Sequence, residues 1–137
     1  MTNRGDLLPP SADDLAAMAA DIIESFPPAF QALIRTIPIR VQDWPDEAQL
    51  ADLGLDDPLD LTGLYAGVPL GQADGLRLPR AAPDMIYLFR QPILFEWCER
   101  GSAIEDVVFD VLTHEIGHHF GMDEAAARRL EQDGAEE

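Results

Sequence analysis

All three histidines of this 137-residue chain lie within six consecutive positions, in the run HEIGHH at 114–119. His114 and His118 are four residues apart, so on a helix they lie one turn apart on one face, where both imidazole rings can reach one metal ion. Glu115 lies beside that face and could take a proton from a water on the metal. The spacing therefore predicts that this segment is a helix and that the helix carries a metal site.

The residues before the histidines predict a long amphipathic helix that runs to about Phe120. Ser102 and Glu105 form a capping-box pattern at its expected start. One face changes from aliphatic to imidazole at alternating steps of three and four residues. Its members are Ile104, Val107, Val111, His114 and His118. Two buried histidines that bond to backbone carbonyls are the alternative, but the spacing together with Glu115 favours the metal site.

Two histidines do not complete a catalytic zinc site, which usually has three protein ligands and an open position for water. The chain has no fourth histidine, so the third ligand must be of another type. Gly121 can end the helix in a left-handed conformation, and Glu124 then stands at the last ligand position of the longer pattern HExxHxxGxxH. We predict Glu124 as the third ligand and Asp123 as the alternative. Both could instead belong to the acidic first turn of a last helix.

The rest of the chain predicts α and β elements in one domain. Residues 1–10 are expected to be a flexible arm, and residues 11–137 a single domain. Ser11 is the expected cap of an N-terminal helix that ends before Pro27. The pattern further predicts short helices at 29–35, 46–53 and 123–132, a helix from Pro92 to about Glu99, and strands at 37–43, 61–66 and 84–90.

Composition limits the classes of partner. The counts of 9 Lys+Arg and 26 Asp+Glu give a net charge of −17, which argues against binding to nucleic acid or to anionic membranes. No apolar run has the length of a membrane span and no secretory signal is visible, so we expect a cytoplasmic protein. Cys98 is the only cysteine, which excludes an internal disulfide and a cysteine-rich zinc site. Its simplest role is that of a small buried residue.

The segment from Asp84 to Glu124 resembles a bacterial family of small zincin-like metallopeptidases. The resemblance rests on IYLFRQPI at 86–93 and THEIGHHFG at 113–121, and GLYAGVP at 63–69 is similar to the glycine–tyrosine turn region of the family. It implies a small zincin-like α+β fold, in which an N-terminal helix and a small mixed sheet pack on the long HExxH helix, with one metal at the cleft. Family members often carry Asp at the position of Glu124.

The resemblance also suggests how a substrate could bind. In zincins an exposed sheet edge above the metal pairs with an extended peptide. Met85 to Arg90 is the expected edge, because it is the strongest strand by β-propensity and comes just before the metal-binding helix. An ordinary strand inside the sheet is the equally weighted alternative.

The residues and the resemblance together predict a zinc-dependent hydrolase of the metallopeptidase type, whose partner is a peptide or protein substrate. One Zn²⁺ per chain is expected on His114, His118 and Glu124. Glu115 is the expected catalytic base, which takes a proton from the attacking water and passes it to the leaving amine.

Two points stay open at this level. No histidine or tyrosine follows Glu124, so the oxyanion donor would have to be Tyr65, Tyr87 or Arg90, or the site has no such donor. The alternative function is a non-catalytic metal-binding domain, with a regulatory or interaction role, that keeps the ligands but cleaves nothing. A weaker alternative is an acidic interaction protein in which the motif is incidental.

Overall fold

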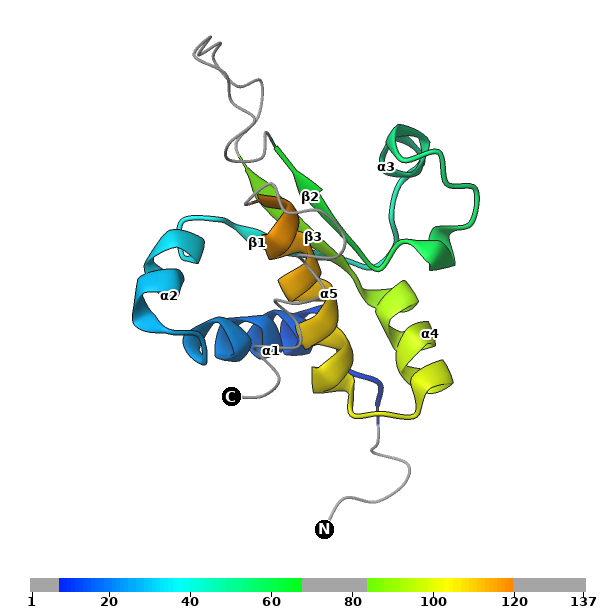
Figure 1. Cartoon of the computed structure of the whole chain (residues 1–137). Helices are drawn as coiled ribbons and strands as arrows, with labels where there is room; N and C mark the ends of the chain where they lie inside the picture. Colours follow the sequence, from blue (N-terminus) through cyan, green and yellow to red (C-terminus); the bar gives the residue numbers. More distant parts are fainter. Residues whose placement is uncertain (1–7, 68–83, 120–137) are drawn as a thin grey trace, which may run out of the picture.

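Helices and strands follow one another in nearly the order that the hydrophobic pattern predicts. The computed structural model describes residues 8–67 and 84–119 (Figure 1). Its elements are α1 (Ala12–Glu24), α2 (Pro28–Ile34), β1 (Ile39–Gln42), α3 (Glu47–Asp52), the 3₁₀ turn η2 (Pro58–Asp60), β2 (Gly63–Ala66), β3 (Met85–Phe89), α4 (Arg90–Arg100) and α5 (Ile104–His119). The predictions for residues 1–7 and 123–132 lie outside the described residues.

The predicted N-terminal cap is confirmed for α1 and wrong for α5. α1 has the predicted cap Ser11, and the structure adds a complete capping box, in which Ser11 Oγ accepts from Asp14 N at 3.1 Å and the Asp14 carboxylate accepts from Ser11 N at 2.8 Å. The predicted cap of α5 is wrong, because α5 begins at Ile104 and is therefore preceded by Ala103 rather than Ser102. Glu105 is then the second helical residue, so the spacing of a capping box is not met.

The sheet is mixed and three-stranded, with the order β1-β3-β2. β1 runs parallel to β3, with Val41 opposite Leu88, and β2 runs antiparallel to it, with Tyr65 opposite Ile86. The prediction that Met85–Arg90 is an exposed edge is therefore wrong, since both sides of β3 are paired. An apolar strand of high β-propensity suits this central position, where it is covered by neighbours on both sides.

The core lies between one face of the sheet and two helices. Ile86 and Leu88 of β3 are fully buried there, and α1 and α5 contact each other and the strands. The aliphatic part of the stripe predicted for α5 contributes to this core, together with a neighbouring apolar stripe of the same helix. The α5 members are Ile104, Val107, Val108, Val111, Leu112 and Ile116. Figure 1 shows α1 and α2 to one side of the sheet and α3 to the other. The core therefore holds α5 in a fixed position against β2 and β3.

α4 turns part of its surface outward. Pro92 and Ile93 are buried, whereas Cys98 is exposed, contrary to the prediction that it is buried. The reason is position, since five residues place Cys98 about 140° around the helix from Ile93.

None of the helices in the described part of the chain is long and apolar enough to cross a membrane. The fold is thus the small α+β arrangement that the sequence predicted.

Candidate metal centre

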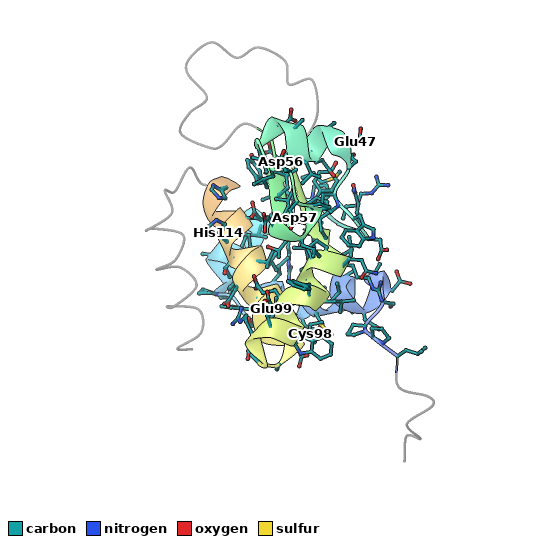
Figure 2. All side chains as sticks on the ribbon, turned by 90° about the vertical axis from the view of Figure 1, so that its right-hand side faces the viewer. Glu47, Asp56, Asp57, Cys98, Glu99 and His114 are labelled. Atoms are coloured by element: carbon teal, nitrogen blue, oxygen red, sulfur yellow. The ribbon has the colours of Figure 1, made fainter. Side chains whose placement is uncertain are left out.

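His114 and His118 face each other on the last turns of α5. Their Nε2 atoms lie 3.1 Å apart, and their rings meet edge to face with centroids 4.7 Å apart and planes at 77°. Both side chains are partly exposed. Figure 2 shows His114 on the upper part of α5, whereas Cys98 and Glu99 lie near the lower end of the molecule. The predicted pair of ligands is therefore brought together on the last turns of α5, at partly exposed positions beside the buried residues Glu115 and Ile116.

The distance between the two ring nitrogens suits a shared zinc ion. With Zn–N bonds of about 2.0–2.1 Å at a tetrahedral angle, two ligating nitrogens lie about 3.3 Å apart. The observed 3.1 Å is close to this value. A direct N–H···N hydrogen bond, with the donor set by the tautomer, would also fit this separation. A zinc ion on the two histidines would give Glu115 a metal-bound water from which to take a proton. A hydrogen bond between the two histidines would not.

Glu115 points into the same space. A carboxylate oxygen of Glu115 and one ring nitrogen each of His114 and His118 all lie within 4.8 Å of one another. The Glu115 side chain is buried, and its Oε1 accepts a hydrogen bond from the Tyr65 backbone N–H at 3.0 Å. Among the residues that the structure describes, these three side chains form the group that could hold a metal ion.

The other residues predicted for the metal lie beyond the described part of the chain. Glu124 and its alternative Asp123 are among them, as is Gly121, so the third ligand stays a prediction. The side chain of His119 is also outside the description, although its backbone forms the last residue of α5. The structure thus brings together two of the three predicted ligands and the predicted base.

The three candidates for the oxyanion donor lie in different places. Tyr65 packs against the core and stands opposite Ile86, so it lies on the face of the sheet that α5 covers. Tyr87 points to the other face, where its ring is stacked with that of Phe89 and the two ring centroids lie 6.2 Å apart.

Arg90 lies at the start of α4, and its guanidinium is bound to other groups. Its terminal nitrogen forms an ion pair with Asp43 at 2.9 Å, and its Nε donates to the Pro10 carbonyl at 2.6 Å. Tyr65 therefore lies on the side of the metal-binding helix and Tyr87 on the opposite face, while the guanidinium of Arg90 is bound to Asp43 and Pro10. The Tyr65 hydroxyl donates a hydrogen bond to Asp84 Oδ1 at 3.0 Å.

Gly63 is a residue of the site that the sequence analysis did not single out. A Cβ at this position would lie 2.6 Å from Val111 Cγ1 and 3.2 Å from Glu115 Cγ. β2 can therefore approach α5 this closely only with a glycine here. A glycine inside a short strand is a known signal for close approach of another group, and it could have indicated this contact.

The comparisons with known proteins agree with the geometry. The family model described as zincin-like metallopeptidase matches residues 34–134, which is well over half of the chain. The matched range includes all three strands and the whole of α5. No match was found among curated proteins.

Proposed function

The chain belongs to the zincin-like metallopeptidase family, and from this premise we propose that it is a zinc-dependent peptidase whose site is built on α5. Its class, a zinc hydrolase at the level of the family, rests on the family match and on the His–Glu–His group. The observation that carries the proposal is the convergence of two imidazole nitrogens, 3.1 Å apart, with a buried carboxylate from the same helix.

The proposed site assigns a role to each side chain. His114 and His118 hold the metal through their Nε2 atoms, and Glu124, with Asp123 as the alternative, completes the set. When bound there, zinc supplies a Lewis acid that activates water and polarises the carbonyl of the substrate. Glu115 takes the proton of the attacking water and delivers it to the leaving amine.

The proposed oxyanion donor is the hydroxyl of Tyr65. Its support is its place on the α5 side of the sheet, whereas Tyr87 lies on the opposite face. The hydroxyl donates to Asp84 Oδ1 at 3.0 Å, so it would have to exchange this acceptor for the oxyanion. A donor aimed at the position where negative charge develops is worth about 10²–10³ in kcat in other enzymes. The proposed substrate is a peptide or a protein, which the match to a metallopeptidase family supports.

The metal is tested first, by elemental analysis of the purified chain after incubation with zinc and removal of the excess. We expect about one zinc per chain in the wild type. His118→Ala should lose it, whereas His119→Ala is the matched control, because that neighbouring histidine is predicted to lie off the ligand face. A wild-type chain that keeps no zinc would refute the proposal and leave two imidazoles joined by a hydrogen bond.

Hydrolysis is tested next, with a library of peptides and the variant Glu115→Gln. The variant should keep its zinc and lose activity by about 10²–10⁴-fold, the range of a lost general base. If it cleaves peptides as fast as the wild type, Glu115 is not the base. If the wild type binds zinc but cleaves no peptide of the library, the non-catalytic metal-binding domain becomes the better account.

A further inference from the structure

The backbone N–H of Tyr65 points away from the sheet. Phe89 N donates to Thr62 O at 2.9 Å, so Thr62 and Phe89 form a hydrogen-bonded pair of the antiparallel ladder. Such pairs alternate with non-bonded ones, and Tyr65 stands opposite Ile86 in a non-bonded pair. Ile86 N agrees with this, because it donates to Pro38 O on the β1 side at 3.0 Å. The Tyr65 donor therefore lies on the outer side of β2.

A side chain of α5, rather than another strand, accepts from this donor. Glu115 Oε1 lies 3.0 Å from Tyr65 N, across 50 residues of sequence. Glu115 as a whole is only 8% exposed, so its side chain lies largely within the protein. A hydrogen bond from a fixed main-chain amide to a carboxylate is charge-assisted and directional. It fixes one oxygen of Glu115 and thereby limits the orientations open to the other.

Gly63 sets the distance on which this bond depends. A Cβ there would come within 2.6 Å of Val111 Cγ1, closer than side chains tolerate, and β2 would have to move away from α5. Gly63 and Tyr65 belong to the same four-residue strand. A shift of β2 at Gly63 would therefore also carry the Tyr65 N–H away from Glu115.

We propose that the main-chain N–H of Tyr65 is a positioning group for the carboxylate of Glu115, and that Gly63 is needed because it lets β2 lie close enough to α5 for this bond. The inference rests on the proposed function in one respect, namely that Glu115 is the base. The existence of the bond does not depend on any activity, so the two can be tested apart. A base held in one orientation before the substrate arrives saves the cost of ordering it during the reaction.

The bond is tested by amide hydrogen exchange, followed by NMR in the wild type and in Glu115→Ala. The Tyr65 amide should exchange about tenfold faster or more in the variant, as expected for the loss of a hydrogen bond to a charged group. The Leu64 amide is the internal control, because Leu64 stands opposite Tyr87 in a bonded pair of the ladder. If the ratio of the Tyr65 rate to the Leu64 rate is the same in both proteins, the proposal is wrong.

The positioning role is tested with Gly63→Ala, Val111→Ala and the double variant. Gly63→Ala should lower kcat by about 10- to 100-fold, the cost of a slightly misplaced group, with KM and zinc content unchanged. Val111→Ala removes the Cγ1 atom nearest to the new methyl group and leaves only the milder contact with Glu115 Cγ at 3.2 Å, so the double variant should recover most of the kcat and most of the slow exchange of Tyr65. Full kcat together with fast Tyr65 exchange in Gly63→Ala would overturn the positioning role.

If Gly63→Ala does not fold, the exchange experiment on Glu115→Ala still decides whether the bond forms. If the wild type folds and binds zinc but hydrolyses no peptide, the proposed function fails on its own. In that case slow exchange of Tyr65, lost in Glu115→Ala, still supports the contact, and unchanged exchange overturns it.

Discussion

The third metal ligand is the residue whose identity decides the coordination of the site. Glu124 and Asp123 are adjacent acidic residues, and the spacing from His118 favours Glu124. We expect Glu124→Ala to weaken zinc binding by about 100-fold or more. Loss of a group that only hydrogen-bonds to a metal ligand already lowers metal affinity by about 10- to 100-fold. Asp123→Ala should bind zinc as the wild type does. Competition with a chromophoric chelator measures both affinities. If neither variant binds zinc more weakly than the wild type, the third ligand lies elsewhere.

Two tyrosines on adjacent strands provide a matched test of the oxyanion donor. Tyr65 lies on the face of the sheet that α5 covers, and Tyr87 on the opposite face. Tyr65→Phe should lower kcat by about 10²–10³-fold with little change in KM, because the hydroxyl acts on charge that develops in the transition state. Tyr87→Phe should leave kcat unchanged. Steady-state kinetics on one cleaved peptide compares the two, and an equal effect of both would point to packing rather than to the hydroxyl.

At the scale of the elements, the caps of the helices make a testable contrast. Ser11 caps α1 through a complete capping box, whereas Ser102 lies one residue too early to cap α5. Ser11→Ala should therefore lower the free energy of unfolding by about 1 kcal/mol. Ser102→Ala should change it by less than about 0.5 kcal/mol, as is usual for a surface position. Urea unfolding of both variants checks this, and a loss of 1 kcal/mol in Ser102→Ala would place the start of α5 earlier.

The same elements show what the sequence could and could not predict. Periodicity located α1 and α5, because a stripe of apolar residues is a property of one helix. The convergence of His114, Glu115 and His118 followed for the same reason, since all three lie within two turns of α5. The central place of β3 was not predictable, because propensity describes a strand and says nothing of its neighbours. The bond from Tyr65 to Glu115 joins residues 50 positions apart and depends on how β2 packs on α5.

At the scale of the whole molecule, the metal site and the core share one helix. Buried side chains hold α5 along its length as far as Ile116, and its last turns also carry the proposed ligands. A metal that binds the folded chain and not the unfolded one adds to stability by mass action, by about 2.7 kcal/mol at 100 times its Kd. For a domain of this size that corresponds to a rise in Tm on the order of 10 °C.

The melting temperature with and without zinc therefore reports on the site independently of any substrate. The wild type should melt several degrees higher with zinc than with a chelator. A chain of net charge −17 also attracts cations to its surface, so a rise by itself does not locate the ion. His118→Ala separates the two effects, because it keeps every acidic residue and removes one ligand. A rise of equal size in this variant would mean that the ion binds at surface carboxylates and that the imidazole pair of α5 is not its site.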